Sequence, residues 1–238
     1  MDEPKVGPLE LARIAARGLA SLVGRAPAAP TQTPEGPVVV SPDTLRERRI
    51  PPRQVQTRKW PVLHAGPTPR VDLATWDLRV EGLVESPTRW TWPEFRALAR
   101  TTVRADMHCV TRWSRLDNSW EGVSIASLLT AVRPRPDAAF VLVHGDGGYS
   151  TNLPLAEFAA EDCLLAWSHD GRPLDADHGA PLRLVVPRLY AWKSAKWVRR
   201  IEFLAFDKPG FWERNGYHNH GDPWALNAAG TDSAERFS

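Results

Sequence analysis

Short runs of alternating or continuous apolar residues, closed by glycine or proline, constrain the fold of this chain more than any other feature. Residues 76–84 and 197–206 alternate apolar with polar side chains, a pattern that predicts strands with one buried face. Residues 140–144 (FVLVH) and 182–186 (LRLVV) are mostly apolar and are closed by Gly145 and Pro187. Both runs predict strands, and the first of them is expected to be buried.

Short helices are predicted between these strands. Thr91 is followed by Pro93 and Glu94, the residue types that cap and open a helix, and this helix is expected to run to about residue 100. Residues 124–132 begin with a serine cap, and residues 152–158 turn into a helix through Pro154. An irregular mixture of short strands and short helices favours a single α+β domain over a repeated βαβ pattern.

The ends of the chain differ in composition from the middle. Residues 27–37 are rich in proline, alanine and threonine, as linkers are. We therefore expect a flexible N-terminal arm and linker at residues 1–50, a folded domain at 51–226 and a C-terminal tail at 227–238. Within the arm, residues 9–23 are typical of a short amphipathic helix.

Composition excludes several classes of protein. The net charge of +2 and the absence of a Lys/Arg block argue against nucleic-acid binding. No run approaches the ~20 apolar residues of a membrane span, and Arg13 and Arg17 interrupt the apolar N-terminal stretch where a signal peptide would carry none. The chain has two cysteines, which we take as reduced, so we expect a cytoplasmic protein.

One of these cysteines, Cys109, lies in an unusual setting. It follows His108 and precedes Arg112 and Trp113, and neighbouring cationic groups favour a thiolate over a thiol. Cys109 is therefore a soft metal ligand, a nucleophile or a small core residue. Cys163 lies in an apolar run without basic neighbours, which indicates a structural role.

Two further segments combine basic side chains with small ones. One is the run from His178 to Arg183, and the other is the run from Trp192 to Trp197, in which Lys193, Ser194 and Lys196 alternate. Arginine binds phosphate in a two-pronged manner and lysine binds it as a point charge. The two segments together suit a phosphate-bearing ligand.

Three motifs resemble the molybdenum-cofactor domain of the sulfite oxidase family. They are CVTRWSRLDNSWEG, HGAPLRLVVP and YAWKSAKWVRRIEF, which occur in the family's order and approximate spacing. The resemblance covers roughly residues 60–224 and is strongest to small stand-alone bacterial oxidoreductases of this family. It implies the family's mixed α+β molybdopterin-binding fold and an enzyme that transfers oxygen atoms in two-electron steps.

The resemblance also implies roles for individual residues. Cys109 corresponds to the thiolate that binds molybdenum, with one molybdenum per chain held by a molybdopterin. The expected cofactor-binding residues are Val62, Leu63, His64, Asp146, His178, Arg183, Ser194, Ala195 and Lys196. Haem is not expected in this chain, so electrons would be exchanged with a separate electron-transfer partner.

The chain departs from the family where sulfite would bind. Leu63 stands where sulfite oxidases have an arginine, and Val110 to Ser114 replace residues that include further arginines. A sulfite dianion needs such charge neutralisation, because an unpaired buried anion is costly. The pattern after the cysteine is similar to that of bacterial methionine sulfoxide reductase catalytic subunits. We therefore expect a small S-oxide or N-oxide as substrate, with Arg112 and Trp113 joining Cys109 in the catalytic site, and sulfite oxidation as the alternative.

Two interpretations from other classes remain. Cys109 is a nucleophile with His108 or His178 as its base, or the chain is a non-catalytic module that keeps the fold without the metal. Adjacent residues of a strand point to opposite faces, which makes His108 a poor base for Cys109.

Overall fold

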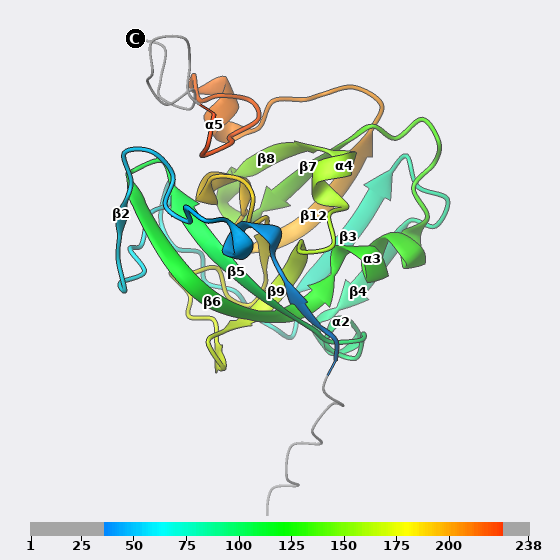
Figure 1. Cartoon of the computed structure of the whole chain (residues 1–238). Helices are drawn as coiled ribbons and strands as arrows, with labels where there is room; N and C mark the ends of the chain where they lie inside the picture. Colours follow the sequence, from blue (N-terminus) through cyan, green and yellow to red (C-terminus); the bar gives the residue numbers. More distant parts are fainter. Residues whose placement is uncertain (1–35, 226–238) are drawn as a thin grey trace, which may run out of the picture. The chain divides into compact units, whose positions relative to one another are not determined.

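Two β-sheets form the frame of the protein (Figure 1). The computed structural model describes residues 36–225. The first sheet has the strand order β1-β5-β6-β9-β10, with β2 paired to β6 and β11 paired to β9. Its strands are β1 (Val38–Val40), β2 (Val55–Gln56), β5 (Thr101–Cys109), β6 (Trp113–Ser124), β9 (Leu164–His169), β10 (Arg172–Pro173) and β11 (Arg183–Val185).

The second sheet has the order β4-β3-β12-β7-β8. Its strands are β3 (Asp77–Gly82), β4 (Thr88–Thr91), β7 (Phe140–Gly145), β8 (Ser150–Pro154) and β12 (Val198–Leu204). β12 pairs in parallel with β3 and antiparallel with β7, so both sheets mix the two directions with connections of irregular length. This arrangement confirms the predicted α+β fold class.

The helices are short and connect the strands. α2 (Trp92–Arg96) starts where Thr91 donates its backbone N–H and its hydroxyl to the Glu94 carboxylate, at 2.8 and 2.7 Å. The remaining helical elements are η1 (Pro42–Leu45), α3 (Ile125–Val132), η2 (Asp146–Gly148), α4 (Leu155–Phe158), η3 (Ala191–Lys193) and α5 (Phe211–Arg214). None of the helices within residues 36–225 has the length and apolar character needed to cross a membrane.

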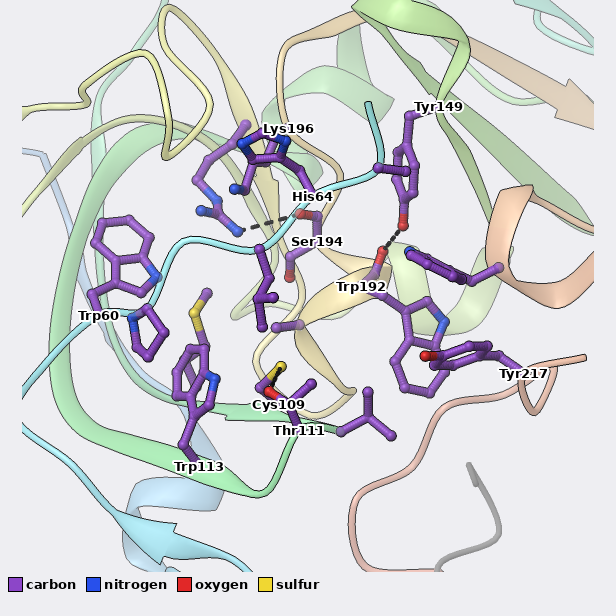
Figure 2. A pocket seen from close by; sticks show the side chains of 18 of the residues that line it. Trp60, His64, Cys109, Thr111, Trp113, Tyr149, Trp192, Ser194, Lys196 and Tyr217 are labelled. Carbon is purple, nitrogen blue, oxygen red and sulfur yellow. Dashed lines mark hydrogen bonds between the residues drawn. The ribbon is translucent and has the colours of Figure 1, made fainter. Parts of the chain in front are cut away.

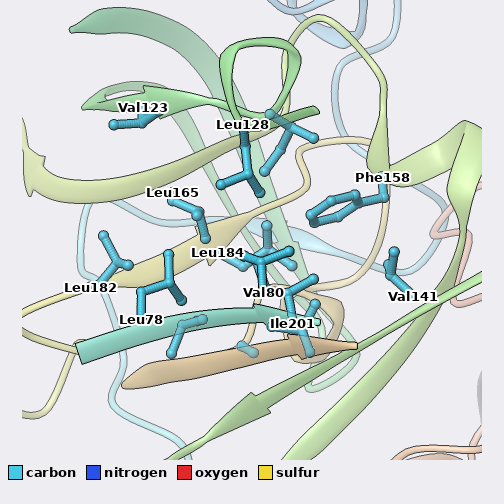
Figure 3. Close-up of a cluster of buried hydrophobic side chains, with 14 of the residues drawn as sticks. Leu78, Val80, Val123, Leu128, Val141, Phe158, Leu165, Leu182, Leu184 and Ile201 are labelled. Carbon is cyan, nitrogen blue, oxygen red and sulfur yellow. The ribbon is translucent and has the colours of Figure 1, made fainter. Parts of the chain in front are cut away.

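The main hydrophobic core lies between the two sheets (Figure 3). Leu78 of β3 and Ile201 of β12 come from one sheet, and Val123 of β6 and Leu165 of β9 come from the other; all are fully buried. Alternate residues of β9 point to the opposite face, where Leu164 packs in a second, smaller cluster with side chains of β5 and β6. The first sheet is therefore buried on both faces around β9. The smaller cluster packs against β5, the strand that ends at Cys109, and against its partner β6.

Most of the predicted elements are present. The strands at 76–84, 140–144, 182–186 and 197–206 correspond to β3, β7, β11 and β12, and the helix at 124–132 is α3, with Ser124 Oγ accepting from Ser127 N. The helix after Thr91 ends at Arg96 rather than near residue 100, because the chain turns there to enter β5.

One prediction was wrong in part. Residues 152–154, expected to open a helix, belong to β8, which pairs with β7 at Leu142–Asn152 and Val141–Leu153. Pairing with a neighbouring strand outweighs the local helix signal of Pro154, and the helix starts only at Leu155.

The N-terminal boundary also differs from the expectation. Val38–Val40 forms β1, which pairs in parallel with β5, and Ser41 Oγ donates to the buried Asp162 carboxylate at 2.7 Å. Residues 38–50 therefore belong to the folded part rather than to an arm. The rest of the expected arm, its amphipathic helix and the tail at 227–238 lie outside the described residues.

Candidate active site

A cavity of about 260 Å³ lies at the end of the β5–β6 hairpin, between the hairpin, the segment 60–65 and the loop that follows β11 (Figure 2). Cys109 is on one wall of this cavity, and Ser194 and Lys196 are on another. Seven of its lining side chains are large aromatic rings, which makes most of its surface apolar. These rings are Trp60, Trp113, Tyr149, Trp192, Trp197, Trp212 and Tyr217.

Cys109 is the last residue of β5, and a tight turn places its thiol in the cavity. Three residues, Val110 to Arg112, connect it to its partner Trp113 in β6, and Arg112 adopts a left-handed conformation with φ of 70°. This is the common three-residue hairpin loop, in which the last residue is left-handed. The sequence places an arginine where such loops prefer glycine, so the turn carries some backbone strain.

The thiol is 8% exposed and has one polar neighbour, the Thr111 hydroxyl at 3.1 Å. Burial raises the pKa of Cys109, and the hydrogen bond to Thr111 and the charge of Lys196 oppose this effect. The neighbouring residues in the sequence do not activate the thiol as expected, because Arg112 is exposed and His108 is buried elsewhere.

Neither predicted base contacts the thiol. His108 Nδ1 is 2.9 Å from Ser114 Oγ, and burial lowers its pKa to about 4. The ring nitrogens of His178 are 2.8 Å from the Asp175 carboxylate and 3.1 Å from the Trp60 carbonyl oxygen. Both histidines are engaged in other hydrogen bonds, which argues against a cysteine-nucleophile enzyme.

Arg183 is the deepest charged group of the cavity wall. It is 2% exposed, and its guanidinium donates to the carbonyl oxygens of His178 and Ser194 at 2.9 and 3.3 Å. Its charge also lies 5.3 Å from the ring centroids of both Trp60 and Trp120. Within residues 36–225 it forms no ion pair, and burial lowers its pKa to about 10. A buried cation without a carboxylate partner, beside a cavity, indicates a site for an anionic group.

Lys196 adds a second cation to the same wall. Its Nζ donates to the Asp177 carbonyl oxygen at 2.6 Å, and burial together with the charge of Arg183 lowers its pKa to about 8. Gly179 packs between these two residues, and a Cβ there would lie 3.1 Å from the Cβ atoms of both Arg183 and Lys196. Glycine is therefore needed for the two cations to approach each other.

The other expected cofactor-binding residues fall into two groups. Leu63, His64 and Ser194 line the cavity, and Ser194 Oγ also accepts from Val186 N at 3.0 Å. His64 is held in place by Gly66 and Thr68, whose oxygens are 2.9 and 3.3 Å from its ring nitrogens.

The second group lies outside the cavity lining. Val62 is exposed, Ala195 is part of the main core, and Asp146 faces Arg199 at 3.6 Å. His178 borders a neighbouring cavity on the other side of Trp60. The two residues expected to act with Cys109 differ in position: Arg112 is exposed and does not line the main cavity, whereas Trp113 lines it. The buried Nε1 of Trp113 lacks a hydrogen-bond partner among the described residues.

Part of the cavity wall was not predicted from the sequence. Tyr149, Trp192, Trp212 and Tyr217 all line it. The Tyr149 hydroxyl donates to the Trp192 carbonyl oxygen at 2.5 Å. The number of tryptophans, 11, is the one sequence signal that pointed to such a pocket.

The described residues fit a metal whose ligands come mostly from an organic cofactor rather than from the protein. No group of three or more His, Cys, Asp or Glu side chains within residues 36–225 is placed to hold a metal ion. A single thiol, two cations without carboxylate partners and aromatic walls meet in one cavity instead. A pterin with a dithiolene and a phosphate matches this donor set, because a soft metal accepts the thiolate and the phosphate is neutralised by the cations.

The fold and the cavity are those of a molybdopterin-dependent oxidoreductase. The family model described as "Oxidoreductase molybdopterin binding domain" matches residues 65–212, and the chain belongs to this family. It is an oxidoreductase whose cofactor is a molybdenum-bearing molybdopterin, as the resemblance implied.

Relatives of known name support this assignment. An uncharacterised oxidoreductase of Bacillus subtilis, YuiH, is 49% identical over 177 residues, which cover 74% of this chain and 89% of the relative. The catalytic subunit MsrP of the protein-methionine-sulfoxide reductase of Gluconobacter oxydans is 31% identical, covering 58% of this chain and 50% of that protein. The sulfite oxidase of Arabidopsis thaliana is 28% identical, covering 64% and 48%. The chain thus spans about half the length of the last two relatives.

A solved structure shares the fold. The sulfane dehydrogenase SoxCD of Paracoccus pantotrophus aligns with a TM-score of 0.59 and 22% identity, covering 74% of this chain and 48% of the other.

Proposed function

We propose that the protein is a molybdenum-dependent reductase that removes the oxygen atom from a small, neutral S-oxide or N-oxide. The observation that carries the proposal is the charge of the cavity. Among the described residues, one arginine and one lysine side chain line the cavity, Arg183 and Lys196. Both lie on the wall that suits the phosphate of the cofactor. With these two neutralised by the cofactor, a dianionic substrate would enter an aromatic pocket without a matching cation.

Cys109 is proposed as the protein ligand of the metal. Its thiolate would complete a sulfur-rich coordination, and the metal would supply the charge that lets the buried thiol ionise. His64, His178, Arg183, Ser194 and Lys196 would hold the pterin and its phosphate, and Val62, Leu63, Asp146 and Ala195 belong to the same proposed set. The bound cofactor supplies the two-electron redox chemistry.

The remaining walls would shape the substrate pocket. Trp113, Trp192 and Trp212 exclude water and offer flat apolar surfaces to the substituents of an S-oxide. The buried indole N–H of Trp113 has no acceptor within residues 36–225, and such a donor suits a neutral S–O or N–O oxygen. We assign no substrate contact to Arg112, since its exposed side chain does not line the cavity.

Reduction of an S-oxide to the sulfide consumes two electrons and two protons and releases water. We propose that the electrons come from a separate donor rather than from a haem in this chain. Both cysteines of the protein are free, which supports a cytoplasmic location.

Sulfite oxidation is the second candidate, favoured by the presence of two cations in the cavity. If Arg183 and Lys196 served the substrate rather than the cofactor, a dianion would be accommodated. Turnover of a methyl aryl sulfoxide with a reduced dye, compared with turnover of sulfite with an oxidised dye, separates the two functions.

The metal assignment is tested by a matched pair of variants. Cys109→Ser should abolish turnover and lower the molybdenum content, whereas Cys163→Ser, which changes a buried thiol outside the cavity, should retain both. Full activity in Cys109→Ser, or wild-type protein without molybdenum and pterin from a cofactor-producing host, would contradict the proposal.

A further inference from the structure

A short strand of the N-terminal part crosses the base of the turn that carries Cys109. β2 pairs in parallel with the start of β6 at Val55–Trp113 and Gln56–Ser114, and Figure 1 shows the two strands side by side there. Val55 N donates to the carbonyl oxygen of Arg112 at 3.0 Å, which holds the left-handed end of the turn. The turn is thus tied to a segment about 55 residues earlier in the chain.

Gln54, immediately before this strand, binds the other end of the turn. Its Nε2 donates to the carbonyl oxygen of Cys109 at 3.2 Å, and that oxygen also accepts from Arg112 N at 2.9 Å. The backbone carbonyl of Cys109 is therefore fixed from two sides. One of these hydrogen bonds lies within the turn, and the other comes from outside it.

The Gln54 amide is itself held in one orientation. Its Oε1 accepts from Ser114 Oγ at 2.5 Å, and Ser114 Oγ lies 2.9 Å from His108 Nδ1. Since the serine hydrogen is directed at Gln54, the histidine must donate through Nδ1. The hydrogen bonds run in one direction, from His108 through Ser114 and Gln54 to Cys109, and such chains strengthen their members.

Two of these groups are shielded from water, and Gln54 is half-buried. His108 and Ser114 are fully buried, and His108 Nε2 has no hydrogen-bond partner within residues 36–225. Buried polar groups cost free energy of folding unless they are hydrogen-bonded. These hydrogen bonds place a directional constraint on the turn that apolar packing alone would not provide.

We propose that Gln54 is a positioning residue for the Cys109 thiol: through its amide, aligned by Ser114 and His108, it fixes the backbone of the turn so that the sulfur stands in the cavity before any metal binds. The inference rests on the proposed role of Cys109 as the metal ligand. In metal sites, the groups that orient a ligand commonly influence affinity by about 10- to 100-fold when they are lost.

Two variants separate positioning from general stability. Gln54→Glu has the same shape and keeps an acceptor for Ser114 but no longer donates to Cys109, and Gln54→Ala removes both links. Gln56→Ala is the matched control, because it changes an exposed glutamine two residues along the same segment. The first measurement is the rate of Cys109 alkylation in the cofactor-free full-length chain carrying Cys163→Ser, which leaves a single thiol to react.

We expect Gln54→Glu and Gln54→Ala to raise the alkylation rate about fivefold or more, the population change that follows from losing one hydrogen bond, while Gln56→Ala matches the parent. In the loaded enzyme, both Gln54 variants should shift the thiolate-to-molybdenum charge-transfer absorption. Unchanged alkylation and unchanged absorption in Gln54→Glu would overturn the inference, even if its melting temperature fell. If instead Cys109→Ser kept its molybdenum, the proposal that Cys109 binds the metal would be wrong. The alkylation rates would still show whether Gln54 fixes the turn.

Discussion

Lys193 Nζ lies 2.6 Å from Glu213 Oε1, and the two side chains are 1% and 2% exposed. The pair joins the loop that carries Ser194 to α5, the helix beside Tyr217. Glu213 Oε1 also accepts from Trp192 Nε1 at 3.1 Å, and Lys193 Nζ donates to the Asn152 carbonyl oxygen at 2.9 Å. The ion pair therefore attaches the C-terminal aromatic wall of the cavity to its cationic wall.

Lys193→Met should destabilise the fold by about 3–5 kcal/mol, because it leaves the Glu213 carboxylate buried without its partner. Urea unfolding at neutral pH measures this loss. Lys208→Met is the control: its amine lies 3.7 Å from Glu202 and is 57% exposed, so its removal should change stability by less than about 1 kcal/mol. Equal effects of the two substitutions would show that the buried pair has no special role.

Arg183→Met should leave the cofactor-free protein within about 1 kcal/mol of the parent, because replacing an uncompensated buried cation removes a desolvation penalty along with its hydrogen bonds. The same variant should lose most of its pterin, measured by fluorescence after release.

Arg188→Met provides the contrast to this variant. Arg188 donates to the buried Asp162 carboxylate at 3.0 Å, so its loss should destabilise the cofactor-free protein by about 2 kcal/mol. A large stability loss in Arg183→Met with full pterin content would refute the assignment of Arg183 to the cofactor.

Asp77 should make stability fall at acidic pH. Burial alone would raise the pKa of this carboxyl, but hydrogen bonds from Arg89, Arg79 and Arg199 lower it to about 2. A carboxyl with a lowered folded-state pKa stabilises the fold above its unfolded pKa of about 3.8, and this contribution disappears as pH falls from there towards 2. Asp77→Asn should cost on the order of 2 kcal/mol at pH 7, and the difference from the parent should shrink by pH 2.

His169 should make stability fall over a higher pH range than Asp77 does. Its ring lies against Trp60 and Trp120, with centroids 4.2 and 4.3 Å apart, and burial lowers its pKa to about 4. In the unfolded chain this histidine binds a proton near pH 6.5, whereas in the folded chain it binds one only near pH 4. Protonation therefore favours the unfolded state as the pH falls from about 6.5 to 4. His169→Gln should flatten this part of the stability profile, as followed by urea midpoints at intervals of pH. A profile unchanged by the substitution would mean that the ring is protonated in the fold.

Arg112→Gly tests whether the turn residue contacts the substrate. Glycine adopts the left-handed conformation of this position without a Cβ penalty, so stability should stay level or rise by up to about 1 kcal/mol. Dye-linked turnover of a neutral sulfoxide should persist in the variant. A marked rise in KM with unchanged stability would instead assign Arg112 to the substrate.

The elements that could be predicted from the sequence are those whose signals are local. Ser124 caps α3, and Thr91 with Glu94 caps α2, because these hydrogen bonds form within four residues of the chain. β8 was missed in part because its existence depends on pairing with β7. The length of β6 was also missed, since its pairing with β5 and β9 decides it and its own sequence, with Asp117 and Asn118, has weak strand character.

The site was predictable only in its outline. The resemblance located Cys109, Arg183 and Lys196, and the fold brings all three to one cavity. The motifs could not show that Arg112 is exposed and absent from the cavity lining, because that depends on how the turn after Cys109 is folded. Nor could they indicate Gln54, whose contact with Cys109 depends on the parallel pairing of β2 with β6.

The isolated charge of Arg183 has a consequence for the living cell. If Arg183 binds the cofactor's phosphate as proposed, a chain made without a supply of the pterin would keep this cation without a counter-ion, and so would lose the stabilisation that a bound anion gives to the native state. Such chains open more often and are exposed to proteases. The amount of this protein should therefore follow the supply of its cofactor, with no dedicated regulator required.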